Sequence, residues 1–277
     1  MPETRKQRVA ARAAPRTRTA VPAKPKGLLA VDVGNSDTVV GLFAGADLAG
    51  FWRITSRPAT ADELTLRLDG LSRAHRWSRP VGAVLCSVSP ALTLPWVRAL
   101  ERFTGALPVE VSAATARDLP IRYHDRTAVG ADRIANAVAA RALYGTPAIV
   151  VDLGTATTFD CISAQGAYLG GAIAPGVASS AEELFRRAAR LPRVELRRPA
   201  RALGRTTEES LQAGVLWGAA GQVDALVRRL ALEMKGTPTV IATGGLATAV
   251  APECETINIV DETLTLKGMR LIWEGAR

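Results

Sequence analysis

Histidine, cysteine and aromatic residues are scarce in this 277-residue chain. It contains two histidines, His75 and His124, and aromatic residues make up 5% of the sequence. The three cysteines lie far apart in apolar stretches, and no two of them form a Cys-x-x-Cys pair. We therefore expect neither a structural zinc site nor a disulfide framework. The cysteines are predicted to be reduced side chains of the core: Cys86, Cys161 and Cys254.

Long apolar runs are missing as well. No apolar stretch approaches the roughly 20 residues that a membrane-spanning helix needs. The first 20 residues contain arginines but lack the apolar segment of a secretory signal. We expect a cytoplasmic protein without a membrane partner. Hydrophobic residues make up 48% of the sequence, which is enough for the core of one large or two modest domains.

Basic residues outnumber acidic residues, and most of the excess lies near the N-terminus. The formal net charge is +9, and residues 1–27 carry eight Lys or Arg against one acid. The other 250 residues are nearly balanced, with 27 bases and 25 acids. We expect residues 1–27 to be a disordered basic extension. It is interpreted either as a weak, salt-sensitive contact with nucleic acid or anionic lipid, or as a dispensable segment or a start codon assigned too far upstream. We do not expect the rest of the chain to bind nucleic acid.

Two similar stretches carry the main functional signal. "LLAVDVGNSDTVVGLF" (28–43) and "AIVVDLGTATTFDCIS" (148–163) each contain an apolar run, then Asp-x-Gly, then hydroxyl residues. Each predicts a hairpin whose glycine-bearing tip brings backbone N–H groups close to an anion such as phosphate. Asp32 and Asp152 cannot bind phosphate directly, but they can hold Mg²⁺ or its water ligands against it. Together with Gly244 and Gly245, the pair predicts a nucleotide site.

The segments around these hairpins also repeat. Strand-like runs such as 48–55 and 82–90 alternate with helical patterns over 60–73, 130–145 and 208–234. A capping box is predicted at Thr60 and Glu63, and a further helix is predicted to begin after Pro95. The repetition indicates an α/β fold built by duplication, with mixed sheets flanked by helices and a ligand cleft between the two halves.

Several motifs together resemble one known family. They are "DVGNS", "WRIT", "GADR" twenty residues before "DLGTATTFD", then "GGAIAPG" and "TGG". The chain resembles the acetate and sugar kinase, Hsp70 and actin superfamily, and within it the type III pantothenate kinases, over nearly all of residues 28–273. The resemblance implies two actin-like (RNase H-like) domains, 28–145 and 146–277. It also implies a cytoplasmic homodimer that phosphorylates pantothenate with ATP and Mg²⁺ in the first step of coenzyme A synthesis.

The resemblance makes Asp132 of "GADR" the catalytic carboxylate, which accepts the proton of the attacking hydroxyl. Phosphoryl transfer needs mainly alignment and neutralisation of charge, so an ionised Asp without a raised pKa is sufficient. The alternative is that Asp132 only caps the helix that begins there, and both roles can coexist.

The other site residues are likewise implied by the resemblance. Arg133 suits the carboxylate of pantothenate because its guanidinium binds carboxylates in a bidentate manner. The expected substrate-binding residues are Tyr123, Gly130, Ala131, Asp132, Arg133 and Thr207. The expected ATP-binding residues are Asp32, Val33, Gly34, Asn35, Ser36, Asp37, Thr38, Val39 and Thr155. Asp152 is expected to bind a monovalent cation, K⁺ or NH₄⁺. The chain departs from the family at Arg126, where proline is frequent, and at Thr206, where asparagine is common.

Alternatives stay open at this point. The helix over 208–234 contains small residues that suit either a dimer interface or close packing within the chain (Ala213, Gly214, Gly218 and Gly221). Another small-molecule kinase of the superfamily is one competing function. An accessory factor for transcription with the same fold is the other, and only the basic extension favours it.

Overall fold

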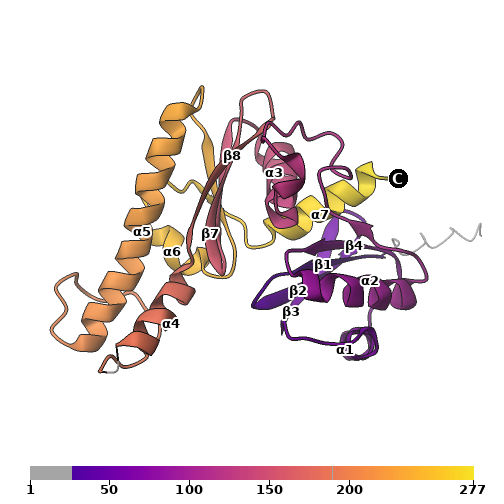
Figure 1. The fold of residues 1–277 in the computed structure, drawn as a ribbon, viewed down its shortest axis with the longest axis horizontal. Coiled ribbons are helices and arrows are strands. Elements are labelled where there is room, and N and C mark those ends of the chain that lie inside the picture. Colours follow the sequence, from indigo (N-terminus) through magenta and orange to yellow (C-terminus); the bar gives the residue numbers. More distant parts are fainter. Residues whose placement is uncertain (1–26, 189) are drawn as a thin grey trace, which may run out of the picture.

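The computed structural model describes residues 27–188 and 190–277. The predicted basic extension therefore lies almost wholly outside the described residues, and the first strand begins at Gly27. The chain forms two five-stranded mixed sheets that are joined through helices (Figure 1). This arrangement confirms the predicted α/β class with duplicated units. The division at residue 145 stays a prediction.

The first sheet has the strand order β3-β2-β1-β4-β5. Strand β1 pairs antiparallel with β2 and parallel with β4, so the predicted hairpin is present. The strands of this sheet are β1 (Gly27–Val33), β2 (Asp37–Ala44), β3 (Asp47–Thr55), β4 (Pro80–Ser87) and β5 (Val109–Glu110).

The second sheet repeats this order as β8-β7-β6-β9-β10. Strand β6 pairs antiparallel with β7 and parallel with β9, as β1 does with β2 and β4. The strands are β6 (Ala148–Leu153), β7 (Ala156–Ile162), β8 (Tyr168–Pro175), β9 (Thr239–Thr243) and β10 (Ile259–Val260). Asp32 and Asp152 occupy corresponding positions, each next to the last residue of the central strand.

Helices cover both sheets, and two of them lie where the sheets meet. Figure 1 shows α3 (Ala131–Tyr144) and α7 (Leu264–Gly275) beside each other between the sheets. Helix α7 contacts β1 and β4, whereas α3 contacts β6 and β7 as well as β4. The C-terminal helix therefore returns to the first sheet. The remaining helical segments are α1 (Ala61–Ala74), α2 (Pro90–Thr104), η1 (Arg126–Ala128), α4 (Val177–Arg187), α5 (Thr207–Glu233), α6 (Ala247–Val250) and η2 (Ala251–Glu253).

The start of α1 agrees with its predicted capping box. The Thr60 hydroxyl accepts the backbone N–H of Glu63, and the Glu63 carboxylate accepts the backbone N–H of Thr60 at 2.7 Å. Two N–H groups that the first helical turn leaves without partners are thereby satisfied.

The start of α2 differs from the prediction. The helix begins at Pro90 instead of after Pro95, because Pro90 already supplies the fixed φ that suits a first helical residue. Pro95 lies inside the helix and cannot donate a hydrogen bond to the carbonyl of Ala91. Burial of Leu92 and Trp96 against the first sheet keeps the helix continuous despite that missing bond.

The cysteines agree with the prediction of reduced thiols. All three are free; Cys86 and Cys161 are buried, and Cys254 is partly buried. In the part of the chain that the structure describes, no helix combines the length and apolarity required to cross a membrane.

The packing of α3 against α7 depends on one glycine. A Cβ at Gly268 of α7 would lie 1.9 Å from the carbonyl oxygen of Ala135 in α3. We predict that Gly268→Ala forces the helices apart and lowers the free energy of unfolding by roughly 3 kcal/mol, measured by urea denaturation.

The matched control is Gly70→Ala in α1, where nothing lies within 4 Å of the added Cβ. This change removes a glycine from a helix interior and is expected to stabilise the protein by about 0.5–1 kcal/mol. Equal midpoints for wild type and Gly268→Ala would contradict the prediction.

Candidate active site

A cleft of about 600 Å³ lies where the hairpin tips of the two sheets meet. The β1–β2 tip, the β6–β7 tip and the turn after β9 all contribute to it. The cleft contains many of the predicted site residues, namely Asp32, Gly34, Asn35, Ser36, Asp37, Val39, Asp132, Asp152 and Thr155, together with Gly244 and Gly245.

The two hairpin tips have similar turns and contact each other. The backbone N–H of Gly34 donates to the carbonyl of Asp37, and that of Gly154 donates to the carbonyl of Ala156, both at 3.0 Å. The hydroxyl oxygens of Ser36 and Thr155 are 3.0 Å apart and share a hydrogen bond. Both side chains are exposed, so hydroxyl and backbone donors from the two sheets face one space that suits an anion.

Two residues of the predicted first phosphate segment point away from the cleft. Val33 is fully buried in the core between the first sheet and helices α1 and α2. Thr38 is also buried, and its hydroxyl forms a 2.9 Å hydrogen bond with that of Ser56. Because side chains alternate along β1 and β2, neighbours of cleft-facing residues face the core.

Three carboxylates converge on the cleft. Burial, and then the neighbouring charge of Asp132, raise the pKa of Asp32 to about 7 and that of Asp152 to about 6. Burial also raises the pKa of Asp132, although the backbone N–H and guanidinium of Arg133 act in the opposite direction. The raised pKa of Asp132 departs from the expected unperturbed carboxylate. The three groups repel one another, so the site favours a bound cation or a proton.

Asp132 does not act as the N-cap of α3. Gly130 occupies the cap position, and Asp132 lies in the first turn, where its carboxylate accepts the backbone N–H of Arg133 at 2.8 Å. Asp132 is thus not the N-cap residue, although its carboxylate satisfies one N–H of the first helical turn. The carboxylate instead lies at the wall of the cleft.

Asn136 is a site residue that the sequence analysis missed. Its amide donates to the Asp152 carboxylate at 3.0 Å, and its carbonyl oxygen accepts the Thr265 hydroxyl at 2.8 Å. It is completely buried and lies one helical turn after Asp132. The i,i+4 spacing of Asp132 and Asn136 in "DRIAN" could have indicated this role, because residues so spaced share one face of a helix.

The turn after β9 passes directly over Asp152. Gly244 has a φ of +91°, and a Cβ there would lie 2.4 Å from the Asp152 carboxylate. Both the backbone conformation and this close approach require glycine. The predicted "TGG" segment thus belongs to the cleft.

A second cluster lies next to the cleft and contains two predicted substrate residues. Arg133 is buried, and its Nε donates to the Asp160 carboxylate at 2.7 Å. The Tyr168 hydroxyl donates to the same Asp160 oxygen at 3.0 Å. The exposed Tyr123 ring lies 6.4 Å from the Tyr168 ring. Asp132, which precedes Arg133, is at the junction between the cleft and this cluster, here called the arginine cluster.

Asp160 is the most deeply buried member of the arginine cluster. Burial raises its pKa to about 7, while the Arg133 guanidinium and the Tyr168 hydroxyl act in the opposite direction. Its second oxygen has no hydrogen-bond partner among the described residues. The arrangement desolvates Arg133 and fixes its direction, which strengthens its interaction with a ligand carboxylate.

The predicted residue Thr207 lies outside the cleft. It is exposed at the first position of α5 and does not line the cleft. Figure 1 shows that the beginning of α5 lies beside α4, on the outer side of the second sheet. One copy of the chain therefore does not bring Thr207 together with Asp132.

The cleft fits a cation that is shared with a ligand. Among residues 27–188 and 190–277, no group of three or more His, Cys, Asp or Glu side chains forms a complete metal cage. Mg²⁺ does not need one, since it usually binds one or two carboxylates and takes phosphates and water as its other ligands. The crowding of Asp32, Asp132 and Asp152 supplies the negative charge for such an ion. The buried Thr243 hydroxyl, which has no hydrogen-bond partner within residues 27–188 and 190–277, adds an oxygen.

Comparisons with known proteins point to one family. The sequence profile described as "Type III pantothenate kinase" matches residues 28–229. A type III pantothenate kinase from Moorella thermoacetica is 48% identical over 252 residues, covering 89% of this chain and 98% of that protein. The corresponding enzyme from Frankia alni is 47% identical over 249 residues, covering 89% and 98% of the two chains.

Solved structures share the fold at lower identity. A Baf family protein from Campylobacter jejuni has a TM-score of 0.56 at 20% identity, covering 89% of this chain and 97% of the other. The ethanolamine utilization protein EutJ from Carboxydothermus hydrogenoformans has a TM-score of 0.55 at 14% identity, covering 91% and 92%. At these identities the likeness concerns the fold alone.

The crowded carboxylates make stability depend on pH. The folded-state pKa of Asp32, about 7, exceeds the unfolded value near 3.9. The folded protein therefore binds this proton more tightly, and its stability falls as pH rises from about 4 to about 7. We predict that Asp32→Asn is more stable than wild type at pH 7.5 by more than about 1 kcal/mol, and that this advantage shrinks at pH 4.5. Urea denaturation of the ligand-free protein at both pH values measures the difference.

Asp224→Asn is a control for which the expected change in stability has the opposite sign. Burial acts to raise the pKa of Asp224, but the N–H groups of Glu255 and Thr256 and the Thr256 hydroxyl lower it overall. This variant should lose stability at pH 7.5. If Asp32→Asn is the less stable protein at both pH values, the proposed electrostatic cost of Asp32 is absent.

Proposed function

Because the chain belongs to the type III pantothenate kinase family, we propose specific roles for its cleft residues in that reaction. The enzyme phosphorylates pantothenate with ATP and a divalent metal, a step of coenzyme A biosynthesis. The observation that carries the proposed roles is the position of Asp132 between the cleft and the arginine cluster. ATP occupies the cleft, and pantothenate lies against the arginine cluster.

Asp132 accepts the proton of the pantothenate hydroxyl as that oxygen attacks the γ-phosphorus. Its burial supports this role, because the raised pKa makes the carboxylate a better proton acceptor than an exposed aspartate. The neighbouring Arg133 N–H and guanidinium favour its ionised form. Most of the remaining catalysis is alignment of the two substrates.

The two hairpin tips bind the phosphates of ATP. The glycine-bearing turns at Gly34 and Gly154 allow close approach of the backbone, and Asn35, Ser36 and Thr155 add polar side chains. Asp32 would hold the divalent metal through its carboxylate, and a metal bound there would supply positive charge against the transferred phosphoryl group. Val33 and Thr38 contribute through backbone position only, since both side chains are buried.

The arginine cluster binds the carboxylate of pantothenate. Nε of Arg133 donates a hydrogen bond to Asp160, and Nη2 donates one to the Phe159 carbonyl at 3.4 Å. The remaining guanidinium N–H groups are directed to the substrate. Gly130 and Ala131 at the start of α3 leave room for the substrate, and the exposed Tyr123 ring covers one side of it.

Asp152 binds a monovalent cation, K⁺ or NH₄⁺. Support comes from its burial beside Asp132 and from Asn136, which orients one carboxylate oxygen and leaves the other under the Gly244 turn. A singly charged ion bound here would balance the charge of the second buried carboxylate, while Asp32 remains available to the divalent metal.

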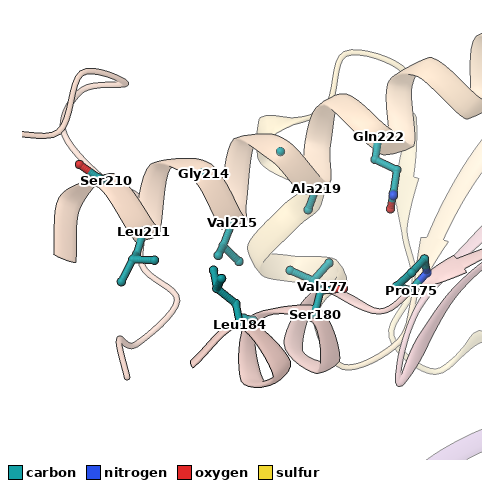
Figure 2. A pocket seen from close by; sticks show the side chains of 12 residues that line it. Pro175, Val177, Ser180, Leu184, Ser210, Leu211, Gly214, Val215, Ala219 and Gln222 are labelled. Carbon is teal, nitrogen blue, oxygen red and sulfur yellow. The ribbon is translucent and has the colours of Figure 1, made fainter. Parts of the chain in front are cut away.

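The active enzyme is a homodimer that packs through α5. A groove of about 350 Å³ lies between α4 and α5, and Figure 2 shows Leu184 and Val215 pointing toward each other across it. Nothing lies within 4 Å of a Cβ added at Gly214, Gly218 or Gly221, so the side of α5 that borders the groove leaves room for a second chain. We assign the expected close backbone contact to a second copy. The same contact would bring Thr207 to the partner's substrate site.

The competing functions receive less support. Pantothenate kinase relatives match 89% of the chain, which argues against a sugar or acetate kinase. A transcription factor without catalysis would not need Asp132 in the cleft, and the basic extension that favours DNA binding lies outside the described residues. We place the reaction in the cytoplasm, in keeping with three free cysteines.

The first test is formation of phosphopantothenate by the purified protein with ATP, Mg²⁺ and K⁺. We predict that Asp132→Asn lowers kcat at least about a hundredfold because the proton acceptor is lost, whereas ATP still binds. Replacement of K⁺ by Na⁺ should lower turnover of the wild type. A folded, ATP-binding wild type that forms no phosphopantothenate would rule out the assignment.

A separate prediction concerns the dimer. Gly218→Leu places a bulky side chain on the α5 face and should convert the dimer to a monomer in sedimentation velocity, with loss of activity because Thr207 no longer reaches the partner. The control is Leu66→Ser in α1, away from α5, at a side chain that is 70% exposed. A Gly218→Leu protein that stays dimeric shows that α5 is not the interface.

A further inference from the structure

We propose that Arg53 binds the triphosphate of ATP directly and links the two halves of the enzyme around it. Arg53 lies in β3, in the "WRIT" segment, and none of the roles proposed above involves it. The inference rests on the proposed binding of ATP in the cleft. It assigns a further donor-binding residue to that site.

The charge of the cleft singles out Arg53. Of the described residues that line the cleft, Arg53 alone has a basic side chain, whereas five carry carboxylates: Asp32, Asp37, Asp132, Asp152 and Glu262. A triphosphate adds about four more negative charges at neutral pH. Metal ions offset part of this charge, and a guanidinium is the protein group best suited to the remaining phosphate oxygens.

Arg53 is held loosely and is therefore available to a ligand. Its Nη1 lies 3.6 Å from the Asp37 carboxylate, beyond the 2.7–2.9 Å that is typical of a charge-assisted hydrogen bond. The two side chains are 48% and 43% exposed. Such a pair contributes little stability, so the guanidinium can leave Asp37 for a phosphate at small cost.

The position of Arg53 spans the two halves of the cleft. Asp37 lies at the tip of the first hairpin, whereas Gly245 belongs to the turn after β9 in the second sheet. A Cβ added at Gly245 would be 3.3 Å from Nη1 of Arg53, so the guanidinium already rests against that turn. A phosphate placed between the hairpin tips is thus within reach of a cation that is anchored on one sheet and touches the other.

The role proposed for Arg53 concerns the phosphate oxygens alone. This role differs from that of Arg133, whose Nε is committed to Asp160 in the arginine cluster.

The test compares nucleotide binding in variants by isothermal titration calorimetry. The probes are the non-hydrolysable ATP analogue AMP-PNP with Mg²⁺, and AMP, which lacks the β- and γ-phosphates. We expect Arg53→Gln to raise the Kd for AMP-PNP at least tenfold and to change the Kd for AMP less than threefold. Arg53→Lys keeps the charge and should recover part of the affinity. In steady-state kinetics, KM for ATP should rise while KM for pantothenate stays the same.

Two further variants separate phosphate binding from a purely structural role. Asp37→Asn removes the resting partner of Arg53 and one negative charge from the cleft, so AMP-PNP should bind more tightly than to wild type. Arg102→Gln removes an exposed arginine that pairs with Asp62 outside the cleft and should leave both Kd values unchanged.

The outcomes are distinguishable. Unchanged AMP-PNP binding in Arg53→Gln overturns the inference and leaves the cleft assignment intact. Equal weakening of AMP and AMP-PNP by both Arg53→Gln and Asp37→Asn also overturns it, because the pair would then only hold the hairpin. A wild type that binds neither nucleotide refutes the ATP cleft itself.

Discussion

The structure is organised around the repulsion of three carboxylates that share one cleft. Asp32, Asp132 and Asp152 come from β1, α3 and β6, and burial raises the pKa of each, while the charge of Asp132 adds to this effect at Asp32 and Asp152. A fold that served only its own stability would not gather these groups. Their convergence makes sense where cations and a polyphosphate enter together, since the ligand then completes the charge balance that the chain alone leaves open.

The duplicated topology explains how the carboxylates come to meet. In each sheet the central strand is flanked by an antiparallel hairpin partner on one side and a parallel strand on the other, and the aspartate lies near the strand end. After the parallel strand, the N–H of Val88 donates to the Val33 carbonyl, and that of Leu246 donates to the Leu153 carbonyl. Two copies of one sheet edge therefore face each other, and α3 with α7 fixes their separation through a contact that only glycine at 268 permits.

The parts of the fold that depend on local pattern could be predicted from the sequence. Both hairpins, the α1 capping box and the alternation of strands with helices follow from nearby residues, whereas the start of α2 was misjudged because two prolines competed for one role. The spacing after Asp132 places Asn136 on the same helix face, but contacts between residues far apart in the chain could not be found from local pattern. Asn136 meets Thr265 across 129 positions, and Arg53 meets Gly245 across the cleft. No local pattern encodes those distances. The alternation of buried and exposed side chains along β2 could be predicted from the sequence. The resemblance nevertheless placed Thr38 in the site, and its side chain faces the core.

The start of α3 shows how one short segment can serve two binding sites. Successive residues of an α-helix are rotated by about 100°, so Asp132 and Arg133 cannot face the same space. Asp132 faces the cleft, and Arg133 turns to Asp160 and Tyr168. Asn136, one turn after Asp132, returns to the cleft side and holds Asp152. In the roles proposed above, the first turn of the helix therefore separates the phosphate site from the substrate site. The hydroxyl to be phosphorylated would then lie between them, because Asp132 and Arg133 are adjacent in the chain.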